Sequence, residues 1–351
     1  MIRSEENTLI EAKNLVKRYG DTTALNGVSF TFEKGRVYGF LGPNGAGKST
    51  TMNILTGCLA ATEGEVKVNG YDIYRDAKKA KGFIGYLPEQ PPLYVDMTPV
   101  EYLLYVGRAK GLRGEELYRD VDNVIRRTSL VKVRDRLIKN LSKGYKQRVG
   151  IAQALVGNPE IIILDEPTVG LDPKQIIEVR DLISELGRDH TVILSSHILS
   201  EISEVCDYVV IINEGKVVAS DTVENLKTVF EGTNVIDIEA RCKASQVEGV
   251  LAGIEGIKHF EISKKGAGAV NAKIEIAGNA DIRDRIFFAF ADAKYPIVAM
   301  NVEEASLERI FLRLTAGKDD SKEFTKKNKS AKKGKDESYS PVFTSAPGGE
   351  E

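Results

Sequence analysis

The sequence has little cysteine and no long hydrophobic run, and each shortage excludes a class of protein. Its three cysteines, Cys58, Cys206 and Cys242, lie far apart in the 351 residues and form no CxxC pair. This excludes a disulfide framework and a cysteine metal site, and it is typical of a reducing compartment. No apolar run approaches the roughly 18 residues of a membrane span, and the start, with Glu5 and Glu6, lacks an apolar signal region. We therefore expect a cytosolic protein with no direct membrane span, unless a partner holds it at a membrane.

An excess of charge of one sign is also missing. The 49 lysines and arginines nearly balance the 51 aspartates and glutamates, which leaves a net charge of −2. Proteins that bind nucleic acid through a broad surface are usually strongly basic, so this class is disfavoured. The 42% hydrophobic and 28% charged residues are ordinary for a soluble globular protein, and the length suffices for two domains with a tail.

The residues that are present point first to the segment 41–51, which reads LGPNGAGKSTT. Within it, residues 42–49 match the phosphate-binding loop GxxxxGK[ST] in full. Its glycines allow a tight bend that turns backbone N–H groups toward a phosphate chain, and the helix that follows points its positive end at the same place. We expect Lys48 to reach the β- and γ-phosphates and the Ser49 hydroxyl to bind Mg²⁺. The predicted phosphate-binding residues are Gly42, Pro43, Asn44, Gly45, Ala46, Gly47, Lys48, Ser49 and Thr50.

An aliphatic run, residues 161–164, predicts a buried parallel strand that ends in Asp165 and Glu166. A strand of this kind is the usual companion of a phosphate loop. We expect Asp165 to hold Mg²⁺, directly or through water, and Glu166 to polarise the attacking water. His197 follows the next predicted strand, 192–194, and suits a sensor of the γ-phosphate. A packing role is the alternative, since lone histidines are more often packing residues.

Two further candidates have weaker local support. Tyr19 lies before the second predicted strand, where it could stack on adenine or serve as a half-buried tyrosine at a strand edge. The loop 88–92 leaves a predicted strand, and its Glu89 or Gln90 could contact Mg²⁺ or water.

The expected order of elements alternates strands with helices around a mostly helical insertion. Thr98 to Glu101 forms a capping box with proline at the first helical position. Asn69-Gly70 predicts the turn of a hairpin, and Asp172-Pro173 predicts the start of a helix. The expected strands are 8–13, 27–32, 37–41, 83–87, 161–164, 192–194, 208–213 and 216–219, with a hairpin over 64–74 and helices over 49–56, from 98, over 115–128 and from 142.

The remaining third of the chain predicts a second domain and a tail. After a connector, 222–233, the segment 234–316 reads strand, helix, strand, strand, helix, strand, an order typical of a ferredoxin-like sandwich. A last helix would carry Leu307, Ile310, Phe311 and Leu314 on one face. Residues 317–351 are rich in lysine and are expected to be disordered. This tail could touch anionic lipid or nucleic acid, but a solubilising role is favoured.

The segment 141–148, LSKGYKQR, resembles the signature motif of ATP-binding cassette (ABC) proteins. The rest of the motif set stands in order around it: the phosphate loop, the Glu89 loop, Asp165-Glu166, GLDP at 170–173, and His197. The resemblance covers residues 7–230. It implies an α/β fold, a P-loop NTPase cassette with a RecA-like core, an antiparallel β subdomain and a helical subdomain over about 91–157. The expected domains are 1–230, the cassette; 231–316, an accessory α+β domain; and 317–351, the tail.

The resemblance also implies a site shared between two cassettes, expected to be two copies of this chain packed head to tail. Each ATP would lie between one phosphate loop and the partner's Ser142 and Gly144, with Asp172 helping to set the contact. The resemblance places Tyr19 against adenine. The usual signature is LSGGQ, whereas this chain has lysine and tyrosine at two positions. Glutamine is usual where Glu89 stands, so the choice between Glu89 and Gln90 at Mg²⁺ stays open.

These features resemble exporter cassettes of the gliding-motility and ABC-2 group, as does SLERIFLRLT at 306–315. The resemblance implies an ATPase subunit with ATP and Mg²⁺ as cofactors and an integral-membrane permease as partner. It would be cytoplasmic and peripheral on the inner face of the cell membrane. One alternative is a soluble cassette ATPase that acts on ribosomes or DNA, which only the lysine tail supports. Another is an ATP-dependent regulator whose second domain binds a ligand.

Overall fold

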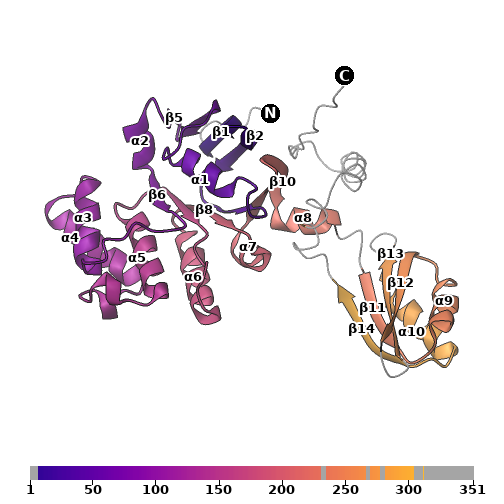
Figure 1. The fold of residues 1–351 in the computed structure, drawn as a ribbon. Coiled ribbons are helices and arrows are strands. Elements are labelled where there is room, and N and C mark those ends of the chain that lie inside the picture. The colour runs from indigo at the N-terminus through magenta and orange to yellow at the C-terminus, as the bar shows by residue number, and fades with distance from the viewer. Residues whose placement is uncertain (1–6, 231–234, 266–268, 277–280, 304–310, 312–351) are drawn as a thin grey trace, which may run out of the picture. The chain divides into compact units, whose positions relative to one another are not determined.

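The computed structural model describes residues 7–230, 235–265, 269–276, 281–303 and 311. The chain divides into two compact units, one running to Thr222 and the other beginning at Val223 (Figure 1). The predicted last helix over 307–314 and the tail lie outside the described residues, apart from Phe311.

A four-stranded antiparallel sheet opens the first unit. Its strand order is β2-β1-β4-β5, and its members are β1 (Thr8–Tyr19), β2 (Thr22–Glu33), β4 (Glu63–Val68) and β5 (Tyr71–Asp72). The predicted strands 8–13 and 27–32 are parts of one longer hairpin. The pairing slips near Asn14, which has a positive φ of 47°. This bulge breaks the alternation of buried and exposed residues on which the sequence-based boundary depended.

The predicted hairpin turn at Asn69-Gly70 is confirmed. Val68 pairs with Tyr71, and both turn residues have positive φ values, 48° and 80°. Two such values in a two-residue turn match the right-handed twist of the flanking strands.

A six-stranded sheet forms the centre of the first unit, in the order β10-β9-β3-β8-β7-β6. All neighbours are parallel except β9 and β10, so the carboxyl ends of β3, β6, β7 and β8 lie along one edge. The α/β prediction is thereby confirmed. The strands are β3 (Val37–Leu41), β6 (Ile84–Leu87), β7 (Ile161–Asp165), β8 (Thr191–Ser196), β9 (Tyr208–Asn213) and β10 (Lys216–Thr222).

Helices surround this sheet, and three of them, α3, α4 and α5, gather in a separate helical part (Figure 1). The predicted capping box is present, because the Thr98 hydroxyl accepts from the backbone of Glu101 while the Glu101 side chain accepts from Thr98. The helices of this unit are α1 (Lys48–Leu55), α2 (Ala77–Gly82), α3 (Pro99–Ala109), α4 (Gly114–Arg127), α5 (Lys143–Leu155), α6 (Pro173–Leu186) and α7 (Leu199–Val205), with 3₁₀ turns at Val131–Val133 and Ile138–Asn140.

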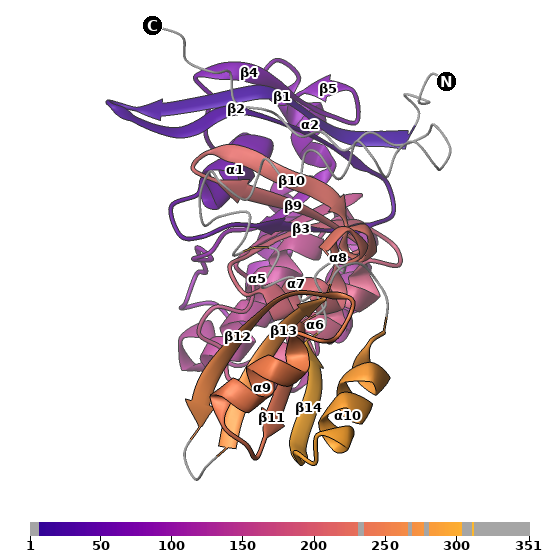
Figure 2. The same ribbon diagram turned by 90° about the vertical axis from the view of Figure 1, so that its right-hand side faces the viewer.

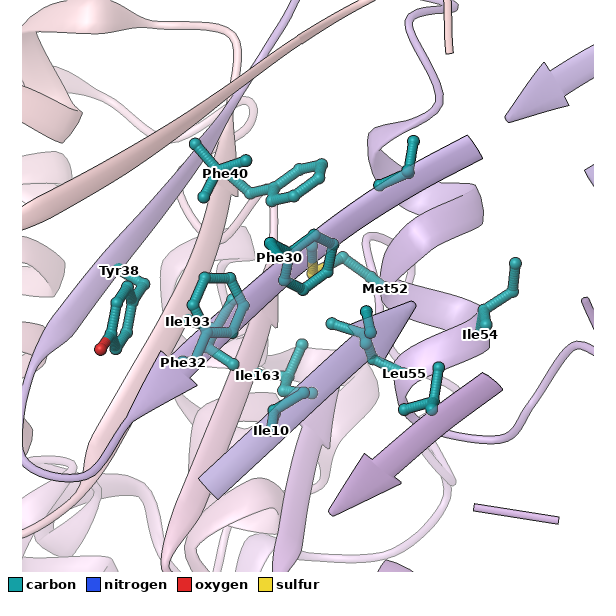
Figure 3. Close-up of a cluster of buried hydrophobic side chains, with 14 of the residues drawn as sticks. Ile10, Phe30, Phe32, Tyr38, Phe40, Met52, Ile54, Leu55, Ile163 and Ile193 are labelled. Atoms are coloured by element: carbon teal, nitrogen blue, oxygen red, sulfur yellow. The ribbon is translucent and has the colours of Figure 1, made fainter. Parts of the chain in front are cut away.

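One hydrophobic core joins the two sheets to α1 (Figure 3). Its phenylalanine rings come from β2 and β3. The ring centroid of Phe30 lies 4.8 Å from that of Phe32 and 5.6 Å from that of Phe40. The side chains of Met52, Ile163 and Ile193 are fully buried in it. The core therefore fixes α1 against the strands from which the site residues emerge.

The second unit has the predicted βαββαβ order, and its sheet runs β12-β13-β11-β14 (Figure 2). This is the strand order of a ferredoxin-like sandwich, with α9 and α10 packed through one core. The predicted connector contains a helix, α8 (Val223–Phe230). The other elements are β11 (Val235–Ala240), α9 (Ala244–Leu251), β12 (Ile257–Lys265), β13 (Ala269–Ile276), α10 (Arg283–Asp292) and β14 (Ile297–Glu303).

Among the residues that the structure describes, no helix combines the length and the apolar character needed to cross a bilayer.

Replacing Ile163 with Ala should lower the free energy of unfolding by about 2–5 kcal/mol, because the side chain is fully buried and its removal leaves a cavity. Chemical denaturation of the purified chain measures this loss. Ile177→Ala is the matched control, since Ile177 is 51% exposed on α6; its change should stay within about 0.5 kcal/mol. Equal losses in the two variants would contradict the assigned core.

Candidate functional site

The phosphate-loop motif lies where β3 ends and α1 begins. Gly45 and Gly47 have φ values of 81° and 105°, in the region that favours glycine. A Cβ on Gly42 would stand 2.5 Å from the carbonyl oxygen of Ile212, and one on Gly47 would stand 2.8 Å from that of Ala24. Glycine is therefore required both for the turn and for the close approach of neighbouring backbone.

Lys48 lies at the first position of α1 and is only 6% exposed. Its ammonium donates to the carbonyl oxygens of Gly42 at 2.9 Å and Pro43 at 3.3 Å, and it lies 3.5 Å from Oε1 of Glu166. These oxygens compensate the burial of the cation. They hold the ammonium at the mouth of the loop.

Asp165 ends β7 and is buried beneath the loop. Its Oδ1 accepts hydrogen bonds from the hydroxyls of Ser195, on β8, and Ser49, at 3.4 Å. Burial raises the pKa of this carboxyl; the two hydroxyls oppose the rise, and the nearby carboxylates of Glu166 and Glu89 add to it. Ser49 and Asp165, both predicted to bind Mg²⁺, therefore lie side by side although they are 116 residues apart in the chain.

Oxygen donors of this kind suit a hard divalent cation such as Mg²⁺. The described residues contain no group of three or more His, Cys, Asp or Glu side chains arranged to hold a metal by themselves. The arrangement therefore fits an Mg²⁺ that takes part of its ligand set from phosphate and water, as this ion usually does.

Glu166 and His197 form the third part of the site. Nδ1 of His197 lies 2.8 Å from Oε2 of Glu166, and because a carboxylate only accepts, Nδ1 carries the shared proton. Glu166 has a positive φ of 49° and donates its backbone N–H to the hydroxyl and the carbonyl of Ser195. The strand ends of β7 and β8 thus place the predicted water-activating carboxylate against the predicted sensor.

The phosphate loop, Glu166 and His197 line one cavity of about 480 Å³, and Asp165 is not part of its lining. Glu89 lines this cavity and Gln90 does not, although both residues are exposed. Sequence reasoning missed Ala24 and Val169, whose small apolar side chains carry no chemical signal. The lining residues are Ala24, Asn44, Gly45, Gly47, Lys48, Ser49, Thr50, Glu89, Glu166, Val169 and His197.

The signature residues lie elsewhere in the same unit. Ser142 caps α5 by accepting from the backbone N–H of Tyr145, and Asp172 caps α6 by accepting from that of Gln175. Ser142, Gly144 and Asp172 together line a second cavity, of about 830 Å³. Within one chain, therefore, the signature residues and the phosphate loop line different cavities.

One departure from the usual signature, Lys143, packs against the loop of Asp172. The Lys143 ammonium lies 1.8 Å from where a Cβ on Gly170 would stand, and the Gln175 side chain lies 2.4 Å from a Cβ built on Gly144. Glycine at both positions lets the two segments meet closely.

Tyr19 ends β1 at the tip of the long hairpin, and 49% of it is exposed. The Lys17 ammonium lies 5.1 Å from its ring centroid. The ring is not part of the phosphate-loop cavity, so its contact with adenine stays a prediction.

Asp165→Asn should stabilise the protein in the absence of nucleotide and Mg²⁺. A raised pKa means that folding disfavours the charged carboxylate, so its contribution to stability is full at acidic pH and is lost as the pH rises through the raised pKa. Asparagine keeps an acceptor for Ser49 and Ser195 without the charge. The Tm of the variant should exceed that of the parent at neutral pH, and the difference should vanish below about pH 4.

Asp122→Asn is the matched control, because Asp122 is a partly exposed carboxylate paired with Arg126 and Arg134. It should bring no gain in Tm. A gain in Tm of the same size in Asp122→Asn, or a lower Tm of Asp165→Asn at neutral pH, would contradict burial as the cause of the raised pKa of Asp165.

Comparison with known proteins agrees with this geometry. A family model described as ABC transporter matches residues 25–169. The chain is 34% identical over 312 residues to the linearmycin resistance ATP-binding protein LnrL of Bacillus subtilis (strain 168), covering 88% of this chain and 98% of the relative. It is 31% identical over 313 residues to the bacitracin transport ATP-binding protein BcrA of Bacillus licheniformis, covering 89% and 98%.

A solved structure shows the same fold. It is a dimeric ATP-binding cassette in a post-hydrolysis state, bound to ADP and Pi. It superposes with a TM-score of 0.57 and 26% identity, over 61% of this chain and 99% of that one.

The two relatives align over more residues than a cassette of 230 residues contains, so the similarity continues beyond the first unit. The matched family model spans both the phosphate loop and the Asp165-Glu166 strand end. The chain therefore belongs to the ABC transporter family and is one of its ATP-binding proteins.

Proposed function

We propose that this chain is the ATP-hydrolysing subunit of an exporter, in which closure of two cassettes around ATP drives a separate membrane permease. One observation carries the hydrolysis: Lys48, Glu166 and His197 line one cavity with the phosphate loop. The names of LnrL and BcrA, for linearmycin resistance and bacitracin transport, support the export direction.

The phosphate loop and Lys48 would hold the β- and γ-phosphates of ATP. A triphosphate would replace the carbonyl and carboxylate oxygens that now surround the Lys48 ammonium. Ser49 and Asp165 would hold Mg²⁺, which supplies charge neutralisation at the β- and γ-phosphates when bound. Glu89 is favoured over Gln90 for the remaining contact, because only Glu89 lines the cavity.

Hydrolysis would depend on the pair of Glu166 and His197. Glu166 would accept a hydrogen bond from the attacking water and orient it toward the γ-phosphate. His197 donates through Nδ1 to Glu166, and a hydrogen bond from Nε2 to the γ-phosphate would use the imidazolium form, in which both ring nitrogens donate. Because phosphoryl transfer needs placement and charge stabilisation more than covalent chemistry, this geometry supports the proposed roles of the two side chains.

A complete site would need a second cassette, since Ser142 and Gly144 do not line the phosphate-loop cavity of their own chain. In a head-to-tail dimer, Ser142 and the Gly144 N–H would reach the partner's γ-phosphate from the positive end of α5. Asp172, close to both, would set that contact. The exposed ring of Tyr19 would stack on adenine.

The permease would dock on the loop 88–97 and the helical part. Tyr94, Val95 and Tyr105 are exposed there, and the rings of Tyr94 and Tyr105 lie 5.3 Å apart. Such an apolar group suits a protein partner. The chain would then be peripheral on the inner face of the membrane, with 1–230 as the cassette, 231–316 as the accessory domain and 317–351 as the tail.

Glu166→Gln should lower ATP turnover by about 100-fold or more while ATP binding persists, because the amide keeps the shape of the side chain but cannot take a proton. Phosphate release and equilibrium binding of a fluorescent ATP analogue measure the two effects. Glu160→Gln is the matched control at the other end of β7, where the carboxylate forms a surface ion pair with Lys34; its turnover should equal that of the parent. Parental turnover in Glu166→Gln means that the assigned base is wrong.

The Glu166→Gln chain with Mg-ATP should capture a multi-span membrane protein in stoichiometric amount from solubilised membranes of its own host. Blocked hydrolysis should hold the cassette dimer closed, which preserves the complex during isolation. Capture of ribosomal or DNA-associated proteins, with no membrane protein, would favour a soluble ATPase instead. Lys48→Ala within the same chain is the control and should reduce capture if closure depends on ATP.

A further inference from the structure

A buried carboxylate outside every motif lies beside the catalytic pair. Glu201 is in the first turn of α7 and only 3% of it is exposed. Its Oε2 accepts from the hydroxyl of Thr168 at 2.6 Å and from that of Ser196 at 3.2 Å. Its Oε1 is buried with no hydrogen-bond partner among the described residues. Burying a carboxylate with an unpartnered oxygen disfavours folding. Stability alone therefore does not account for the position of Glu201.

The two hydroxyls flank the two predicted catalytic residues. Thr168 stands two residues after Glu166, in the turn that leaves β7, and Ser196 directly precedes His197 at the end of β8. One oxygen of Glu201 therefore joins the two segments that must stay aligned. The Ser196 hydroxyl also accepts from the backbone N–H of Ile198 at 3.0 Å, which holds the His197 segment on its other side.

The segment around Glu166 needs such support. Glu166 has a positive φ, a conformation that a residue with a side chain keeps only when its surroundings impose it. Ser195 binds its backbone N–H on one side, and the Glu201–Thr168 bond restrains the turn on the other. The backbone carbonyl of Thr168 also accepts a hydrogen bond from the backbone N–H of Leu171, so the same restraint reaches the loop of Asp172.

We propose that Glu201 is a positioning residue for ATP hydrolysis, which holds Glu166 and His197 in register through Thr168 and Ser196. This inference rests on the proposed roles of Glu166 and His197. Glu201 is absent from the cavity lining, so it acts through the two hydroxyls and not on the nucleotide. ATP affinity depends mainly on the phosphate loop, whereas the rate depends on the alignment of the attacking water; loss of Glu201 should therefore lower kcat and spare binding.

The test uses pairs of variants that remove or keep one hydrogen bond. Glu201→Leu removes the acceptor and Glu201→Gln keeps one; Thr168→Val removes the donor and Thr168→Ser keeps it. We expect Glu201→Leu and Thr168→Val each to lower kcat by about 10-fold or more, with ATP affinity within about twofold of the parent. Glu201→Gln and Thr168→Ser should stay within about threefold in kcat.

The double variant Thr168→Val with Glu201→Leu should lose no more activity than the less active of the two single variants, because both substitutions remove the hydrogen bond between Thr168 and Glu201. Glu204→Gln is the control for α7, since Glu204 is exposed and pairs with Arg180; its kcat should match the parent. The Tm of every variant is measured alongside. If Glu201→Leu does not fold, Thr168→Val against Thr168→Ser decides.

Parental kcat in Thr168→Val and Glu201→Leu overturns the positioning role, as does a loss of ATP affinity that equals the loss of kcat, or losses that multiply in the double variant. Glu166→Gln is assayed in parallel. If it is inactive while the Glu201 variants are fully active, only the positioning role fails. If it turns over like the parent, the proposed hydrolysis mechanism itself fails.

Discussion

The structure depends on one electrostatic constraint: a cation and two carboxylates are buried together at the carboxyl edge of a parallel sheet. Lys48, Asp165 and Glu166 are each at most 6% exposed. Burial of such charges is costly unless each finds partners. The loop carbonyls, the hydroxyls of Ser49 and Ser195, and His197 provide them. A fold that keeps this cluster buried also keeps it preorganised for a phosphate chain.

The parallel sheet meets this constraint because its strand order is not the order in the chain. β3 and β7 are separated by more than a hundred residues, yet both pair with β8. Their ends therefore bring the phosphate loop, Asp165-Glu166 and His197 to one edge. The hydrophobic core beneath, with Phe40, Ile163 and Ile193, fixes the strands rigidly enough for hydrogen-bond distances to be kept.

The helical part serves a different purpose. It carries Ser142 and Gly144 at the start of α5, facing a cavity of its own beside Asp172. In the proposed function, the ATP-binding groups are split between two surfaces of one chain, so that a complete site would need a second chain. Under that proposal, ATP binding would drive closure between subunits, and closure would move the membrane partner.

The sequence by itself predicted the phosphate-binding chemistry of the site and the order of the secondary-structure elements. The phosphate loop, Asp165-Glu166, the Asn69-Gly70 turn and the Thr98 capping box are local patterns, and local patterns follow from backbone geometry and hydrogen bonding over a few residues. Only the tertiary structure showed the length of the first hairpin, the helix within the connector, the place of Glu89 in the cavity lining and the contacts of Glu201. The bulge at Asn14 hides the true strand ends from alternation, and the neighbours of Glu89 and Glu201 come from distant strands. Which residues touch across a sheet is decided by long-range packing, and no short stretch of sequence contains that information.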